Sequence, residues 1–78
     1  MNPILFLQKR FGSTQTKIKA IYFEIERLED EIRYNLEQAK NTSDPDEETY
    51  YSQMVVDIQY AVMVKHSTIE ALQNTTNF

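Results

Sequence analysis

Apolar residues recur at helical spacing along the first half of the chain. Between Ser13 and Lys40 they follow one another at steps of three or four on a mostly polar background. This period matches one face of an α-helix, and its first two heptads have coiled-coil spacing. The pattern predicts an amphipathic helix over about residues 15–40. Its predicted seam consists of Ile18, Ile21, Ile25, Leu28, Ile32, Leu36 and Ala39.

The second half of the chain holds more apolar residues than one seam can use. Helical spacing predicts a second helix over about residues 45–74. The run from Met54 to Val64 contains only two polar residues, Asp57 and Gln59. Its valines and tyrosines also favour strands, but the run does not alternate and a complete helix start precedes it. The predicted seam of this helix consists of Tyr51, Met54 or Val55, Ile58, Val62, Ile69 and Leu72.

Four carboxylates surround one proline between Thr42 and Tyr51, and they allow three interpretations: a metal site, an acidic docking surface or a helix start. A helix–loop–helix calcium site needs a central glycine, which this segment lacks. As a helix start, Asp44 is the N-cap, Pro45 the first helical residue and Glu47 the partner of Asp44 in a capping box. We therefore expect a short turn and an antiparallel helical hairpin.

The first twelve residues form a separate N-terminal arm in this interpretation. Pro3 suits the first position of a short helix, and Gly12 can end that helix in a left-handed conformation. Ile4, Leu7 and Phe11 share one side of this helix, and Leu5 and Phe6 point elsewhere. Two interpretations stay open: the arm clamps its own hairpin (residues 13–78), or it docks on another subunit.

The composition fits a single small all-α domain. A chain of 78 residues buries only ~60% of its unfolded surface, so oligomerisation is a common source of added stability. One glycine and two prolines indicate few, long elements, and the absence of cysteine excludes disulfides.

Charge is distributed unevenly along this acidic chain, whose net charge is −4. Residues 1–22 hold four basic and no acidic residues, whereas residues 23–48 hold ten acidic and three basic residues. A basic end and an acidic middle suit head-to-tail contacts between copies, although two solvated faces explain the same pattern. Four cations make a thin phosphate footprint, so we expect no nucleic-acid partner.

Neither a membrane span nor a secretory signal is expected. The apolar run at residues 4–7 is far shorter than the ~20 residues of a spanning helix. The charges of Lys9 and Arg10 follow this run, whereas a secretory signal places its charges first. The expected location is therefore the cytoplasm, or outside the cell after export by a signal-independent route.

Catalytic residues are also not expected. His66 is the only histidine, and its neighbour Ser67 points about 100° away around a helix, which does not make a nucleophile–base pair. One histidine without cysteine does not supply a typical transition-metal site. We expect no enzyme activity, cofactor or metal.

The surplus apolar residues of the second helix predict an interface with another chain. A hairpin offers each helix one partner face, so part of this surface needs a further protein, either another copy or a different partner. The predicted interface residues are Leu5, Phe6, Val56, Tyr60, Met63 and Val64.

Short motifs in residues 39–78 resemble the needle subunits of bacterial type III secretion systems. The motifs are Ser43-Asp44-Pro45 at the turn and Ser67-Thr68-Ile69 in the second helix. The resemblance implies a helical hairpin that polymerises into a hollow filament. The first helix is more charged than that of a needle subunit and looks closer to the small hairpin chaperones of the same systems. A small adaptor, chaperone or inhibitor, encoded by a secretion system or a phage or other mobile element, is therefore the alternative.

Overall fold

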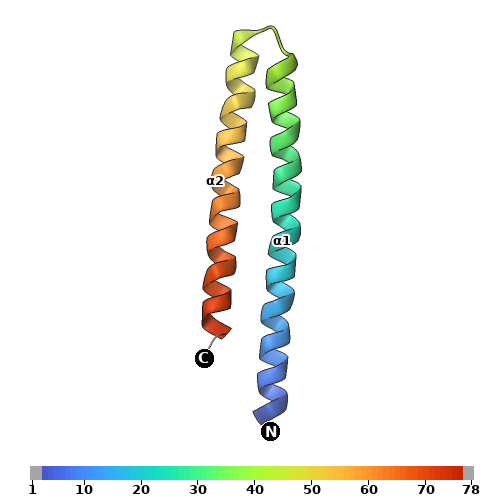
Figure 1. Ribbon diagram of the computed structural model, residues 1–78, viewed down its shortest axis with the longest axis vertical. Helices are drawn as coiled ribbons and strands as arrows, with labels where there is room; N and C mark the ends of the chain where they lie inside the picture. The colour runs from blue at the N-terminus through green and yellow to red at the C-terminus, as the bar shows by residue number, and fades with distance from the viewer. Residues whose placement is uncertain (1–2, 77–78) are drawn as a thin grey trace.

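The protein is an antiparallel hairpin of two long helices. The computed structural model describes the backbone of residues 3–76 and the side chains of residues 12–75. Helix α1 spans Pro3–Asn41, and helix α2 spans Pro45–Thr76. The helices lie side by side, joined by a short turn, and both chain ends lie at the opposite end (Figure 1). The described residues contain no strand, which confirms the predicted all-α hairpin.

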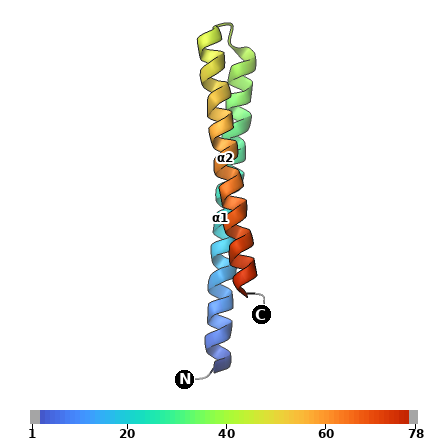
Figure 2. The same cartoon turned by 90° about the vertical axis from the view of Figure 1, so that its left-hand side faces the viewer.

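The molecule is a thin rod rather than a compact domain. Its principal extents are 64 × 16 × 13 Å, and its radius of gyration is 18.4 Å. A compact chain of this length has a radius of gyration of about 12 Å. Figure 2 shows the same two-helix rod from the side, with the beginning of α1 extending past the end of α2. Each helix therefore has one helical neighbour in the chain, and the rest of its surface is open.

The first helix is longer than the sequence predicts. We expected a separate short helix ending at Gly12, but α1 continues without interruption through this residue. Gly12 does not adopt a positive φ, so it does not form the expected left-handed end. A glycine inside a helix costs about 1 kcal/mol relative to alanine, which a helix of many turns tolerates. The hydroxyl of Thr16 also donates to the Gly12 carbonyl at 2.9 Å, an interaction within the continuing helix.

The seam between the helices follows heptad spacing on both sides. In α1 it keeps the alternating steps of three and four that are typical of coiled coils. Its buried or half-buried residues at this spacing are Thr14, Ile18, Ile21, Ile25, Leu28, Ile32, Asn35 and Ala39, and Thr42 of the turn continues the spacing. In α2 the same spacing selects Tyr51, Val55, Ile58, Val62, Lys65, Ile69 and Leu72.

The prediction that Leu36 lies in the seam of α1 is wrong. Leu36 is 51% exposed, whereas its neighbour Asn35 is only 8% exposed. After Ile32, a step of three keeps the seam facing α2, and a step of four turns the side chain away from it. The Asn35 side chain tolerates burial because its Nδ2 donates to the Glu31 carbonyl at 2.8 Å. At this position, therefore, the helical register and not hydrophobicity determines which residue enters the seam.

The tightest part of the core lies in the half of the hairpin away from the turn. Ile18 and Ile25 of α1 form a buried cluster with Ile69 of α2. The side chains of Ile21, Val62 and Leu72 pack around this cluster. Even here no described side chain is fully buried, because two helices cannot enclose a core.

Helix α2 starts as the sequence predicts, and one further residue, Thr42, takes part in its N-terminal cap. Pro45 is the first residue of the helix. The carboxylate of Asp44 accepts the amide N–H of Asp46 at 2.9 Å. Glu47 does not reach the Asp44 amide directly, as a capping box predicts; the hydroxyl of Thr42 lies between them. This hydroxyl accepts the Asp44 N–H at 3.2 Å and donates to the Glu47 carboxylate at 2.7 Å.

Candidate protein interface

The most distinctive surface of the hairpin is the side of α2 that faces away from α1. Tyr60 is two residues from both Ile58 and Val62, so it lies about 200° around the helix from the seam. It is 65% exposed. The other large apolar side chains on this side are also solvent-exposed. We call the following four residues the outward apolar face: Val56, Tyr60, Met63 and Val64.

Polar residues border the outward apolar face at both ends. On the turn side lies Gln53, whose side chain donates at 3.1 Å to Asp57, a charged residue that follows Val56 within the span of the face. On the other side the helix continues with Ser67, which is exposed. The face is therefore a limited patch of about two helical turns, roughly 12 Å long, and not a continuous apolar band. A bounded patch with a polar rim is typical of a specific protein contact.

The corresponding outer side of α1 is polar. Its exposed residues include the charged side chains of Glu26, Asp30 and Arg33, of which Asp30 and Arg33 form an ion pair. Phe23 and Tyr34 are exposed there too, but three helical turns separate them. Isolated exposed aromatics of this kind are normal on a protein surface.

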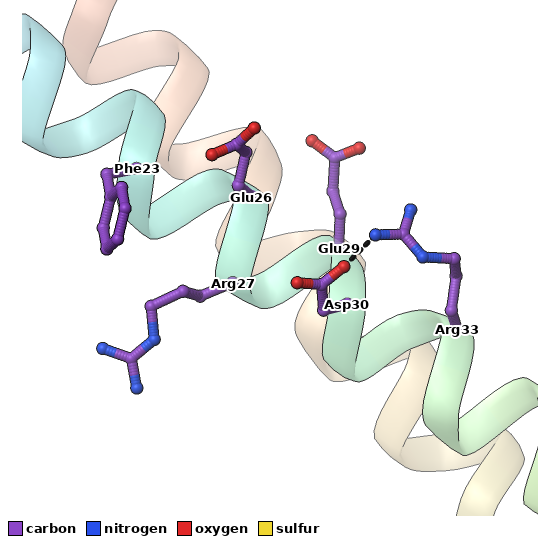
Figure 3. A pocket seen from close by; sticks show the side chains of 6 residues that line it. All are labelled: Phe23, Glu26, Arg27, Glu29, Asp30 and Arg33. Carbon is purple, nitrogen blue, oxygen red and sulfur yellow. Dashed lines mark hydrogen bonds and ion pairs between the residues drawn. The ribbon is translucent and has the colours of Figure 1, made fainter.

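One hollow on the outer side of α1 is shown in Figure 3, and it has a volume of about 360 Å³. Its lining residues all belong to α1 and are all exposed: Phe23, Glu26, Arg27, Glu29, Asp30 and Arg33. Since one helix surface cannot surround a ligand, this hollow lacks the enclosure that small-molecule sites have.

The candidate chemical groups of the sequence do not assemble into a site. His66 and Ser67 are both exposed on α2. Within residues 12–75, no group of three or more histidine, aspartate or glutamate side chains is placed to hold a metal ion. In the described part of the chain, no helix combines the length and apolar character that crossing a bilayer requires.

Sequence analysis missed two polar residues at the seam. Lys65 occupies a heptad position of α2, and its ammonium group pairs with the carboxylate of Glu24 on α1. Asn35 occupies a heptad position of α1. The heptad spacing places Lys65 after Ile58 and Val62, and it places Asn35 after Ile32, so spacing alone identifies both residues. They were missed because only apolar residues were assigned to the seam.

The predicted interface residues are divided between described and undescribed parts. Val56, Tyr60, Met63 and Val64 lie together on α2. Leu5 and Phe6 belong to the first turns of α1, and their side chains lie outside the described residues. The contribution of the N-terminal arm to an interface therefore stays a prediction.

The surface area of the chain is large for its mass. The accessible surface is 6409 Å², for a mass of 9.2 kDa. A folded monomer of this mass has about 4900 Å². The excess, about 1500 Å², follows from the elongated shape, since a two-helix rod exposes more surface per unit mass than a compact domain.

Comparisons with protein-family models, with curated proteins and with solved structures find no match to this chain. The resemblance to needle subunits therefore rests on the sequence motifs alone.

Proposed function

We propose that this protein has no enzymatic role and acts by binding other protein chains through the outward apolar face of α2, in the first place copies of itself. The observation that carries this proposal is the placement of Val56, Tyr60, Met63 and Val64 on one exposed patch of α2. Full burial of a large apolar side chain is worth about 1.5–3 kcal/mol, so a partner on this patch gains substantial free energy.

The thin core supports the same proposal. Only five hydrophobic residues among those described are buried. Two-helix units of this size are marginal alone, and burial against another chain is a general way to stabilise them. Assembly thus supplies stability that the hairpin seam does not.

The most specific form of the proposal is a subunit of a needle-like filament of a type III secretion system. It rests on the turn motif Ser43-Asp44-Pro45 and on the rod shape of the hairpin. A filament requires two different surfaces on each subunit, because one self-complementary surface closes a dimer. The N-terminal arm with Leu5 and Phe6 is the second surface that we propose for that role.

Sedimentation velocity of the full chain over a wide concentration range tests the proposal. We expect the parent chain to associate as concentration rises, and the double variant Val56→Glu/Tyr60→Glu to remain monomeric and helical. The matched control is Ser52→Glu/Gln59→Glu, which adds the same charge to exposed positions of α2 outside the face.

Association that survives in the Val56→Glu/Tyr60→Glu variant would contradict the assigned surface. A parent chain that stays monomeric throughout would contradict self-assembly and would leave a different protein as the occupant, as in an adaptor, chaperone or inhibitor. Large polymers favour the filament form over a defined small oligomer.

A further inference from the structure

The first turns of α1 extend past the end of α2. Glu24 of α1 pairs with Lys65 of α2, so the end of α2 at Thr76 lies level with about residue 13 of α1. The helical part of the N-terminal arm, residues 3–12, therefore has no α2 beside it over roughly 15 Å (Figure 2).

Apolar residues in this part of α1 are not limited to one side of the helix. Ile4, Leu5, Phe6 and Leu7 follow one another directly. Successive residues of a helix lie about 100° apart, so these four positions go once around its circumference. Ile4 and Leu7 continue the heptad spacing of the seam, whereas Leu5 and Phe6 do not. A helical partner covers one side only, and a helix that is apolar all round is typical of an environment that is apolar on every side.

This end of the hairpin is also basic. Residues 1–22 hold four of the eight basic residues of the chain and none of its twelve acidic residues. Lys9 and Arg10 follow within one helical turn of the apolar residues. Lys17 and Lys19 are exposed, and they form no ion pair with an acidic side chain among the described residues. The described part of the hairpin therefore does not neutralise the positive charge of this end.

We propose that this end of the hairpin binds an anionic lipid surface. Stable attachment to a bilayer takes two contributions, because a short apolar segment or a few basic residues alone bind weakly. Here the apolar turn 4–7 enters the boundary between headgroups and acyl chains. The aliphatic stems of Lys9 and Arg10 then allow their charges to reach lipid phosphates. Four cations are too few for a nucleic acid, but a membrane adds the apolar contribution that a nucleic acid lacks.

Charge also determines how the rod is oriented on such a surface. The acidic residues of the turn end are exposed, and they lie at the far end of a molecule 64 Å long. These residues are Asp44, Asp46, Glu47 and Glu48. An anionic surface attracts the basic end and repels the acidic end, whereas a rod lying flat would bring both ends to the surface. We therefore expect the hairpin to stand with its turn away from the lipid.

This inference goes beyond the proposed function. Self-association through the outward apolar face does not require lipid, and a rod that stands on the surface leaves that face accessible to other chains. In the filament form of the proposal, the same N-terminal arm contacts a protein chain instead. The experiment therefore has to distinguish lipid from protein as the occupant.

Flotation of the full chain with lipid vesicles tests the binding. Vesicles of phosphatidylcholine alone are compared with vesicles that also contain phosphatidylserine, at low and at high salt. We expect binding to the anionic vesicles only, and weaker binding at high salt. Leu5→Ser/Phe6→Ser should weaken it at least about tenfold. The matched control Val56→Ser/Tyr60→Ser removes a similar apolar area from α2 and should float like the parent chain.

Basic residues are tested by a second pair of variants. Lys9→Gln/Arg10→Gln should weaken binding about 20–30-fold, since each basic residue near an anionic surface contributes about fivefold. Lys17→Gln/Lys19→Gln removes the same charge about 12 Å further along α1, beyond the screening length of physiological salt, and should have a smaller effect.

Tryptophan fluorescence reports the orientation, because the chain contains no tryptophan of its own. Phe6→Trp should be quenched by lipids with brominated acyl chains. Phe23 is 64% exposed on the same helix and lies about 26 Å further along it, so Phe23→Trp should not be quenched. Circular dichroism of each variant checks that the hairpin is intact.

Absence of binding to anionic vesicles, or equal binding to both kinds of vesicle, would overturn the inference. Equal quenching of Phe6→Trp and Phe23→Trp would show a rod lying flat and would overturn the end-on orientation. If the parent chain does not float and Leu5→Ser/Phe6→Ser abolishes association in lipid-free sedimentation, the arm binds protein and the inference is wrong. A parent chain that floats but stays monomeric without lipid overturns the proposed self-association and supports lipid binding.

Discussion

The two helices differ most on the sides that face away from each other. On α1 this side is rich in charge, with Glu26, Asp30 and Arg33 in water. On α2 it carries the outward apolar face. An amphipathic helix needs one partner, and α2 provides it for α1. A helix that is apolar on two sides buries both of them only against two partners, and in the described residues α1 covers one side of α2.

The largest expected effect separates the two sides of α2 from each other. Ile58→Glu places a charge in the seam, which we expect to cost at least 3 kcal/mol and to unfold the hairpin, since the buried carboxylate has no partner. The matched variant Val56→Glu puts the same charge on the exposed side and should change the free energy of unfolding by less than about 0.5 kcal/mol. Thermal unfolding followed by circular dichroism, at a concentration where the chain is monomeric, measures both. Equal destabilisation by the two variants would show that the outward apolar face belongs to an internal core.

A smaller effect tests the polar residue in the seam of α1. Asn35→Leu should raise the free energy of unfolding by about 1–2 kcal/mol, because leucine gains more from burial than asparagine does. Such a polar residue fixes register at a cost in stability, so the variant should also associate less specifically. The control is Leu36→Asn, one residue further and exposed, which should have little effect. A loss of stability in Asn35→Leu, measured by urea unfolding, contradicts the seam register described above.

The smallest effect concerns the start of α1. An added methyl group at Gly12 meets no atom within 4 Å. Gly12→Ala should therefore stabilise the helix by about 0.5–1 kcal/mol, since it removes the entropy cost of glycine. If α1 instead ended at Gly12 in a left-handed turn, alanine would be strained there and the melting temperature would fall. Ser13→Ala, at the next exposed position, controls for the general helix preference of alanine.

Much of the hairpin was predictable from the sequence because its signals agree with each other. Helical spacing predicted both helices, and Asp44 with Pro45 predicted the start of α2. The end of a helix at Gly12 was not predictable, because a glycine that stops a short helix is tolerated inside a long one. The sequence analysis placed Leu36 in the seam instead of Asn35, because it gave more weight to hydrophobicity than to the heptad register.

The proposed interface was predictable only in part. An excess of apolar residues indicates that a partner is needed, and the hairpin shows where these residues lie. The identity of that partner depends on a surface that belongs to another molecule, which one sequence does not contain. Only where the partner is a second copy does the same sequence describe both surfaces.

The isoleucine cluster far from the turn has a consequence for how the hairpin opens. In a hairpin, the covalent link holds one end together, and loop-closure entropy makes the contacts farthest from the link the most costly to form. Those contacts are here the tightest, with Ile18, Ile25 and Ile69 buried together, while the buried Asn35 lies nearer the turn. The covalent turn therefore holds the two helices together at one end, and the isoleucine cluster holds them together in the other half of the hairpin. Amide protons between the turn and the cluster should then exchange only through opening of the whole hairpin, whereas those at the helix ends exchange through local fraying.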